Sequence, residues 1–209
     1  MTLTEFKRLP ERGTNDPDTV NAILDSALVG HVGFLRAGHP AVIPTLVVRR
    51  GDQAYIHGSP ASALIRAGKA GAEICLTVTL IDGLVLARSA FHHSANYRSA
   101  VVYGQGRWVE GEEKVDVFEA LVEKIVPGRL PHLRPLTRKE MAATGVVALG
   151  LDQATAKIRT GPPADEEADY DLAIWAGVVP IETVFADPVP DPRNQPGLSV
   201  PDHVGRLEP

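Results

Sequence analysis

Cysteine is almost absent from this chain of 209 residues, which contains Cys75 alone. A single cysteine cannot form an internal disulfide, and it cannot supply the cysteine cluster of a structural zinc site. Because Cys75 lies within an apolar run, we expect a buried, unreactive thiol rather than a nucleophile. The scarcity of cysteine favours the reducing cytoplasm as the location of the protein.

Long apolar runs and an excess of positive charge are also missing. No stretch approaches the roughly 18 uninterrupted apolar residues of a membrane helix, and the N-terminal segment MTLTEFKRLPERGTNDP has no apolar core typical of a signal peptide. The formal net charge of −5 argues against nucleic-acid binding. The Rossmann glycine motif, the P-loop, the hydrolase nucleophile elbow and the HExxH zinc motif are absent. Adjacent His92 and His93 rarely reach one ion together, so we expect no metal site.

What is present is mostly a β pattern. Alternating or continuous apolar residues predict strands at 31–38, 40–51, 53–59, 72–89, 100–111 and 145–152. The Asp82-Gly83 pair within 72–89 predicts a hairpin turn. The fold class is therefore mainly β with short helices, because the regular alternation of strand and helix that marks a doubly wound sheet is lacking. An antiparallel β-barrel with a few covering helices fits this order.

Helical spacing is confined to short segments. Asp16-Pro17 predicts the capped start of a helix that ends before Gly30. Residues 112–126 predict a second helix with Val115, Phe118, Val122 and Ile125 on its buried side. Residues 137–140 have the form of a capping box before a short third helix. We divide the chain into an N-terminal arm (1–15), one domain (16–185) and a proline-rich tail (186–209) that is extended or disordered.

The stretch IHGSPASALIRAG (56–68) predicts an anion site. A strand ends at His57-Gly58, and a helix is expected from Pro60 to about Ala67, with Ser59 as N-cap and Ser62 in the first turn. Free amides at a helix start, two hydroxyls, a glycine and a histidine together suit a phosphate group. Ordinary helix capping would explain the same residues.

Two further polar clusters are candidates. The segment HHSANYRS (92–99) separates two apolar strands, and its Arg98 and Ser99 could bind an anion. Lys157 and Arg159 lie two residues apart in a strand and therefore face the same side, where a surface ion pair is the alternative. Trp175 lies in an apolar segment and either packs in the core or stacks on a flat ligand.

Three segments resemble the pyridoxamine 5'-phosphate oxidase-like superfamily of FMN-binding split β-barrels, in the flavin-nucleotide-binding branch that includes nitroimidazole-resistance proteins. These segments are VIPTLVVRRGDQAYIHGSPAS (42–62), TLIDGLVLARSAFHHSANYRSAVVYGQG (79–106) and AKIRTGPPADEEADYDLAIWAGVVPI (156–181). The resemblance runs from about residue 16 to residue 181. The chain lacks the arginine-rich substrate signature that true pyridoxamine phosphate oxidases carry near the C-terminus. Ser62-Ala63 stand where nitroimidazole-type relatives often carry a lysine.

The resemblance implies a six-stranded antiparallel split β-barrel that forms a homodimer with two FMN sites at its interface. In this expectation three groups of residues contact the cofactor. Pro44, Thr45 and Val47 border the isoalloxazine ring; His57, Gly58, Ser59 and Ser62 hold the phosphate; Asn96, Tyr97, Arg98 and Ser99 add contacts. Lys157 and Arg159 reach the phosphate or the substrate, and Trp175 covers the ring from the partner subunit.

The function that follows is an FMN-dependent oxidoreductase, transferring hydride or electrons between NAD(P)H and a small organic acceptor. The flavin performs the redox chemistry, so no side chain is assigned as catalytic; Tyr97 and His57 are the proton donors we would name. A non-catalytic flavin or haem binder, acting as carrier or sensor, is the alternative. Because relatives also bind haem or the deazaflavin F420, an F420-dependent reductase is a further alternative.

Overall fold

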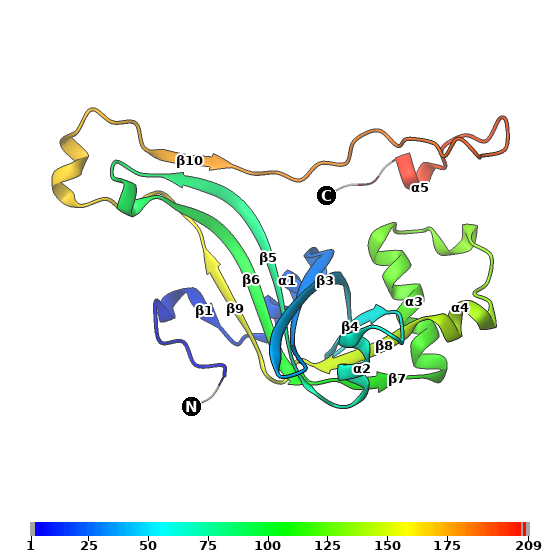
Figure 1. Ribbon diagram of the computed structural model, residues 1–209. Helices are drawn as coiled ribbons and strands as arrows, with labels where there is room; N and C mark the ends of the chain where they lie inside the picture. The colour runs from blue at the N-terminus through cyan, green and yellow to red at the C-terminus, as the bar shows by residue number, and fades with distance from the viewer. Residues whose placement is uncertain (1–2, 206, 208–209) are drawn as a thin grey trace.

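The computed structural model describes residues 3–205 and residue 207. The few positions outside it, 1–2, 206 and 208–209, belong to the expected arm and tail. In the described residues, ten strands form a single antiparallel sheet that curves into a half-barrel (Figure 1). The strands are β1 (Gly13–Thr14), β2 (Val29–Arg36), β3 (His39–Arg50), β4 (Gln53–Gly58), β5 (Glu73–Leu86), β6 (Ser94–Gln105), β7 (Arg107–Val109), β8 (Gly145–Gly150), β9 (Ala154–Arg159) and β10 (Gly177–Pro180).

The sheet has the order β1-β9-β6-β5-β2-β3-β4-β8-β7, and β10 pairs with the far end of β5. The expectation of a mainly β, antiparallel barrel with short helices is confirmed, but the expected number of six strands is wrong. Part of the N-terminal arm, Gly13–Thr14, pairs with β9, and the apolar segment near residue 178 pairs with β5. Both additions join strands far apart in sequence, which a pattern of local residues does not reveal.

Five short α-helices accompany the sheet within the described part of the chain. They are α1 (Pro17–Ser26), α2 (Ala63–Lys69), α3 (Gly111–Ile125), α4 (Arg138–Ala143) and α5 (Asp202–Gly205). Short 3-10 turns lie at Pro10–Arg12, Ala90–His92, Leu130–His132 and Glu167–Asp171. No described helix has the length and apolarity needed to cross a bilayer.

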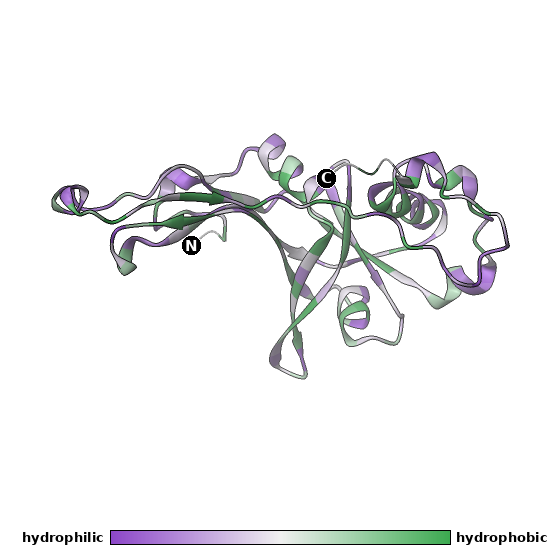
Figure 2. Cartoon of the chain, turned by 90° about the horizontal axis from the view of Figure 1, so that it is seen from above, coloured by the Kyte–Doolittle hydropathy of each residue, from purple (hydrophilic) through white to green (hydrophobic). Residues whose placement is uncertain are grey.

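The core lies inside the curve of the sheet. Val32 of β2, Leu76 of β5 and Val102 of β6 are fully buried there, and Leu24 of α1 packs with them. A second, smaller cluster lies on the opposite side of β4 and β8, where Val117 of α3 packs. In Figure 2 the strands are mostly green, as this burial requires, and the 3-10 turn at the far end of the projecting strands is purple.

The strands β5 and β6 project well beyond the barrel and end in the loop 87–93 (Figure 1). The Asp82-Gly83 hairpin turn expected within this region is wrong, because β5 continues through it with a β-bulge between Ile81 and Gly83. Asp82 is bound by Arg98 at 2.8 Å, and β10 runs so close that a Cβ on Gly83 would lie 3.1 Å from Val178 Cγ1. Position 83 therefore needs a glycine because β10 packs closely against it, and not because the chain turns there.

After β10 the chain is extended and crosses back over the molecule to α3 (Figure 1). Its end carries α5, and the His203 ring stacks on His132 with centroids 4.3 Å apart. The described residues of the tail, which the sequence predicts to be extended or disordered, contain no strand, and their one helix is the short α5.

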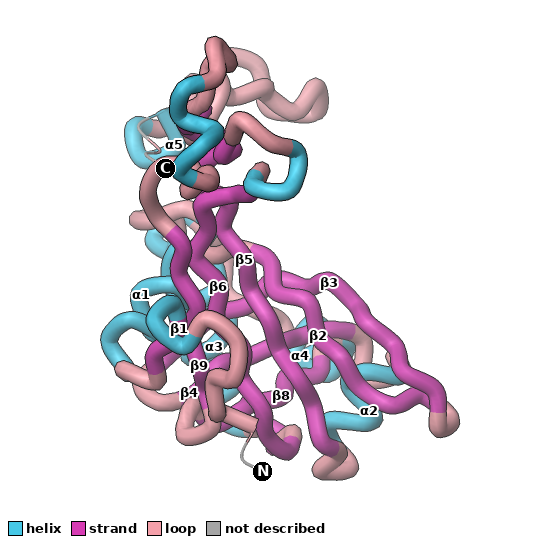
Figure 3. Tube along the Cα trace, turned by 90° about the vertical axis from the view of Figure 1, so that its left-hand side faces the viewer, coloured by secondary structure: helices cyan, strands magenta, loops and turns pink. Residues whose placement is uncertain are grey.

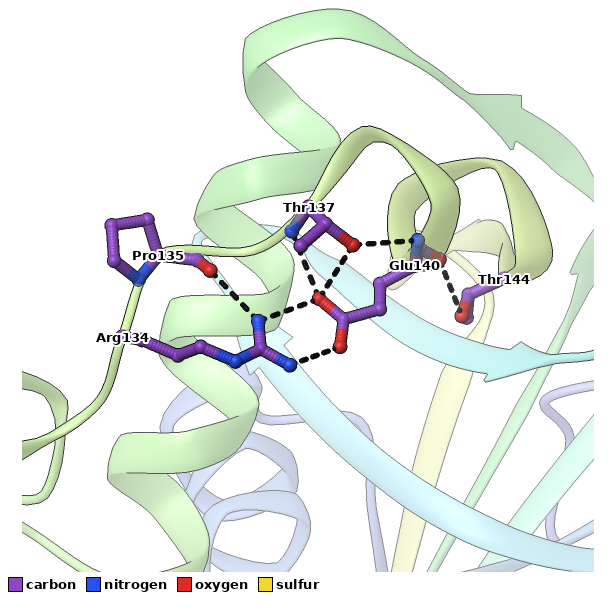
Figure 4. A network of polar contacts seen from close by, with 5 residues as sticks. All are labelled: Arg134, Pro135, Thr137, Glu140 and Thr144. Carbon is purple, nitrogen blue, oxygen red and sulfur yellow. Dashed lines mark hydrogen bonds and ion pairs between the residues drawn. The ribbon is translucent and has the colours of Figure 1, made fainter.

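Local capping chemistry sets two helix starts as the sequence predicts. Asp16 accepts from the Thr19 amide at the start of α1. At α4 the Thr137 hydroxyl accepts from the Glu140 amide, and the Glu140 carboxylate accepts from the Thr137 amide at 2.8 Å. Arg134 holds the same carboxylate in an ion pair (Figure 4). The buried side of α3 differs from the prediction, because Lys114, Val117 and Leu121 face inward.

Candidate functional site

The loop between β4 and α2 is the first candidate site. The helix begins at Ala63, three residues later than expected, and its N-cap is Ser62, whose hydroxyl accepts from the Ile65 amide at 3.3 Å. Ser59, predicted as the N-cap, instead accepts from the Ala61 amide within the loop. The correction follows from the turn formed when the Ser62 amide donates to the Ser59 carbonyl, which delays the helix.

This loop presents hydrogen-bond donors and no acidic side chain. The amides of Ala63 and Leu64 donate to no group in the described chain, as expected for the first residues of a helix. The hydroxyls of Ser59 and Ser62 each accept one hydrogen bond and keep their own protons for donation. These donors fit an anionic phosphate group. Gly58 keeps α2 close to β4, because a Cβ there would lie 3.3 Å from Ile65 Cγ1.

His57 and β3 border the same loop. Thr45 donates its hydroxyl proton to the His57 carbonyl at 3.4 Å, which joins β3 to the end of β4. The His57 side chain is half-buried, and this burial lowers its pKa, so the ring is neutral near pH 7. Pro44 is exposed and Thr45 half-buried, whereas Val47 is enclosed in the core at 1% exposure.

Asn96 and Arg159 form a buried polar pair on the projecting strands. Arg159 donates to the Asn96 side-chain oxygen and to the carbonyls of Gly161 and Pro162. Asn96 in turn donates to the Gly161 carbonyl at 3.1 Å. Both side chains are only 8% exposed. Their donors are thus largely committed to holding the chain after β9 against β6.

Residues 94–99 of the segment 92–99 lie in β6, whereas His92 ends the 3-10 turn Ala90–His92 and His93 follows it before the strand. Arg98 is held by Asp82, and Ser99 donates to the Lys157 carbonyl at 3.2 Å. Tyr97 is half-buried and is the cross-strand partner of Arg159. Lys157 donates to the Arg8 carbonyl of the N-terminal arm at 2.9 Å.

Trp175 is exposed and lies between the turn Glu167–Asp171 and β10. Its ring packs on Gly177, where a Cβ would lie 3.0 Å from the indole. With 67% of its surface exposed, it is available to a flat ligand or to another protein surface. Trp175 precedes β10, which runs along the projecting part of β5, whereas the loop 58–62 leads into α2, which lies against the barrel and away from the projection (Figures 1 and 3). A single chain therefore does not bring the two groups of predicted site residues together.

Sequence reasoning missed Lys124, a cation of α3. Its ammonium donates to the carbonyls of Leu24 and Val47 at 2.8 and 2.9 Å, and burial lowers its pKa to about 8. Lys124 lines a cavity of about 580 Å³ together with Arg98 and with Phe185, which lies in the segment after β10. The only signal in the sequence is a lysine next to the apolar side of a predicted helix, which is too common to identify a site.

The comparisons with known proteins agree with this architecture. The family model described as pyridoxamine 5'-phosphate oxidase matches residues 16–158. The chain belongs to this family. The family match covers the barrel and ends just before the segment that follows β9. No curated protein matches the chain.

The chain is similar to two solved structures over almost its whole length and almost the whole length of each of them. The flavocytochrome Anf3 from Azotobacter vinelandii is 42% identical, with a TM-score of 0.90, and the match covers 96% of this chain and 94% of that protein. The FAD and heme binding protein from Mycobacterium smegmatis is 36% identical, with a TM-score of 0.88 and coverage of 92% and 95%. A protein named for 5-nitroimidazole antibiotic resistance, from Bacteroides thetaiotaomicron, is 22% identical over 70% of this chain and 86% of its own, with a TM-score of 0.58. That last likeness concerns the fold alone.

Proposed function

We propose that this protein is a flavin- and haem-binding redox protein that acts as a homodimer and transfers electrons from NAD(P)H to a small organic acceptor. The observation that carries the proposal is the similarity over nearly the full length to a flavocytochrome and to an FAD and heme binding protein, at 42% and 36% identity. Both matches extend well beyond the 143 residues of the family model, which spans 16–158. The single cysteine suits a reducing cytoplasm.

The loop 58–62 supports flavin binding. The hydroxyls of Ser59 and Ser62 and the amides of Ala63 and Leu64 offer several donors within one short segment, and no carboxylate in it would repel a phosphate. FAD is the flavin we propose, by analogy with the Mycobacterium smegmatis protein, and FMN is the alternative that the sequence favours. A bound flavin would accept a hydride and pass on single electrons.

We infer that a second copy of the chain completes the proposed site. The predicted cofactor residues lie in two groups that one chain holds apart, with Ser59 near α2 and Trp175 on the projection. A homodimer in which the projection of one copy reaches the α2 loop of the other would unite them. Trp175, exposed at 67%, would then cover the flavin ring of the partner.

The decisive experiment is the absorbance spectrum of the purified protein, followed by chromatography of the cofactors released on denaturation. Flavin bands together with a Soret band support the proposal, and the released flavin separates FAD from FMN. Anaerobic addition of NADPH or NADH then tests whether the flavin is reduced and whether the haem follows. A yellow protein without a Soret band that resists every nicotinamide reductant would favour a flavin carrier, and a colourless protein that takes up neither cofactor would refute the proposal.

Ser59→Ala and Ser62→Ala together test the phosphate assignment. The double variant removes two hydroxyl donors, and we expect about a hundredfold weaker flavin affinity or more, since each lost hydrogen bond to a charged group costs roughly 1.5–3 kcal/mol. Ser94→Ala, which removes an exposed hydroxyl at the start of β6, is the control. Unchanged flavin affinity in the double variant would remove the assignment while leaving the cofactor spectrum of the wild type intact.

A further inference from the structure

A cavity of about 580 Å³ lies between the half-barrel and the chain that follows β10. Its walls come from the end of α1, from β5 and β6, from the end of α3 and from the returning chain around Phe185. Figure 1 shows this chain leaving β10 and running back across the molecule toward α3. No residue of the fully described loop 58–62 lines the cavity, so it is separate from the proposed phosphate site. Its volume lies within the range of about 300–1,000 Å³ typical of small-molecule sites.

Much of the cavity wall is apolar and open to water. Five large apolar side chains that line it keep between 38% and 45% of their surface exposed: Leu28, Ile81, Ile125, Ile181 and Phe185. Single apolar residues scattered over a surface need no explanation, but these converge on one hollow from separate elements. An apolar molecule bound there would remove this surface from water.

Lys124 brings a positive charge to the cavity without an acidic partner. Its ammonium donates to the carbonyls of Leu24 and Val47 at 2.8 and 2.9 Å, and no carboxylate of the described residues forms an ion pair with it. A charged lysine has three donors, so one remains for a ligand. Burial lowers the pKa of Lys124 to about 8, which still leaves the ammonium charged in most molecules at pH 7.

Arg98 of β6 adds a second donor to the cavity wall. Its Nε and Nη2 donate to the Asp82 carboxylate at 3.0 and 2.8 Å, whereas Nη1 makes no hydrogen bond with a described residue. The Ile181 amide donates to the Asp82 carbonyl at 3.1 Å, which holds the chain after β10 beside this ion pair. The Nη1 group therefore stays available to an acceptor in the cavity.

The charges around the cavity leave room for one anionic group. Asp25 and Asp82 line it, but each carboxylate is already held by two nitrogens of an arginine. Arg49 binds Asp25, and Arg98 binds Asp82. With Lys124 included, three cations stand against two carboxylates. A ligand with one negative charge balances this set, whereas a cation or a phosphate monoester with nearly two negative charges does not.

We propose that this cavity binds a small apolar molecule that carries a single carboxylate. The carboxylate accepts hydrogen bonds from the Lys124 ammonium and from Nη1 of Arg98. The apolar body packs against the exposed side chains of β5, of α3 and of the chain after β10. This binding site is additional to the proposed flavin and haem sites, and it does not depend on them.

The test is isothermal titration calorimetry of the purified full-length protein, with its cofactors bound, against octanoate and against octanamide. The two probes share a chain length, and only octanoate is charged. We expect octanoate to bind at least about tenfold more tightly than octanamide at pH 7, without release of a bound cofactor, because charge-assisted hydrogen bonds are stronger than neutral ones. As the pH rises from about 7 to about 9.5, Lys124 loses its proton, and the octanoate affinity should fall toward that of octanamide.

Three variants separate the charge from the apolar wall. Lys124→Met should lower the octanoate affinity at least about tenfold and leave that of octanamide unchanged. Lys139→Met, which removes an exposed lysine of α4 outside the cavity, is the matched control and should bind both probes as the wild type does. Phe185→Ala removes part of the apolar wall and should weaken both probes alike.

Equal wild-type affinities for the two probes, or an unchanged octanoate affinity in Lys124→Met, would overturn the proposal. If Lys124→Met does not fold, the pH dependence of octanoate binding by the wild type decides. Release of flavin by octanoate would also overturn it, since the cavity would then belong to the cofactor site. A wild type that binds neither probe would do the same, and the proposed flavin and haem binding would stand in either case.

Discussion

Lys124 on α3 donates a hydrogen bond to the carbonyl oxygen of Val47 on β3, with 2.9 Å between the two atoms. The same ammonium binds the Leu24 carbonyl at the end of α1, so one side chain joins three elements. These partners are neutral, and the nearby Asp25 is bound by Arg49 at 2.6 Å. The charge of Lys124 is therefore only partly compensated in a half-buried position, which explains why its pKa falls to about 8.

The first prediction concerns pH. The unfolded chain keeps the Lys124 proton up to the ordinary pKa of 10.5, whereas the folded protein loses it near pH 8. Between these values the unfolded state binds more protons, so the free energy of unfolding rises with pH. Relative to Lys124→Met, the wild type should gain on the order of 1–2 kcal/mol from pH 7.5 to pH 10, after allowance for solvent screening.

Urea unfolding of both proteins at the two pH values measures this difference, and groups common to both cancel. Lys139→Met, which removes an exposed lysine of α4, serves as the control for loss of a surface charge. A stability difference between wild type and Lys124→Met that stays constant over the pH range would show that burial does not shift this titration.

The second prediction is that Asn96 stabilises the fold. Replacement by alanine leaves the buried Arg159 guanidinium without one of its acceptors and removes the bond from Asn96 to Gly161. We expect Asn96→Ala to lower the free energy of unfolding by about 2–3 kcal/mol, because hydrogen bonds to buried charged groups are costly to leave unmade. Thermal or urea unfolding measures the loss, with Ser94→Ala on the same strand as control. A loss below about 0.5 kcal/mol would mean that water replaces the amide at no cost.

Short-range chemistry explains which parts of the fold the sequence could predict. Asp16 and Thr137 start helices through hydrogen bonds to amides three residues away, and both starts were predicted. The buried side of α3 was not, because the apolar residues of that helix allow more than one inward face. Contacts outside the helix decide, including the bond from Lys114 to the Met141 carbonyl on α4. A pattern of apolar residues carries no information about such a partner.

The candidate site was likewise predictable from the sequence only in part. The residues 57–62 are adjacent in sequence, so their grouping at one loop was predictable even though the helix start was misplaced by three residues. Asn96 and Arg159 come together only through the pairing of β6 with β9. Register between strands is a tertiary property, so nothing in the sequence around Asn96 identified this partner.

The third prediction tests the capping box of α4. Thr137→Ala removes the acceptor for the Glu140 amide, and we expect a loss of about 1 kcal/mol. Hydrogen exchange of residues 138–143 should accelerate, because α4 is a short helix that depends on its cap. Thr137→Ser keeps the hydroxyl and should exchange like the wild type. Equal exchange in all three proteins would indicate that the ion pair between Arg134 and Glu140 holds the helix by itself.

The fourth prediction concerns the seam between β5 and β10. A Cβ on Gly83 would lie 3.1 Å from both Val178 Cγ1 and the Val179 carbonyl, so one strand must move to admit any side chain. We expect Gly83→Val to displace β10, to accelerate hydrogen exchange at 177–181 and to admit proteases to the segment beyond it. Gly104→Ala is the matched control, since its Cβ would meet only the Gly150 carbonyl at 4.0 Å.

Trp175 lies two residues before β10. In the proposed dimer Trp175 covers the flavin ring of the partner, so displacement of β10 should also weaken flavin binding. If residues 177–181 of Gly83→Val exchange as slowly as in the wild type, β10 accommodates the valine without losing its hydrogen bonds to β5. The close contact with β10 would then not explain why position 83 is a glycine.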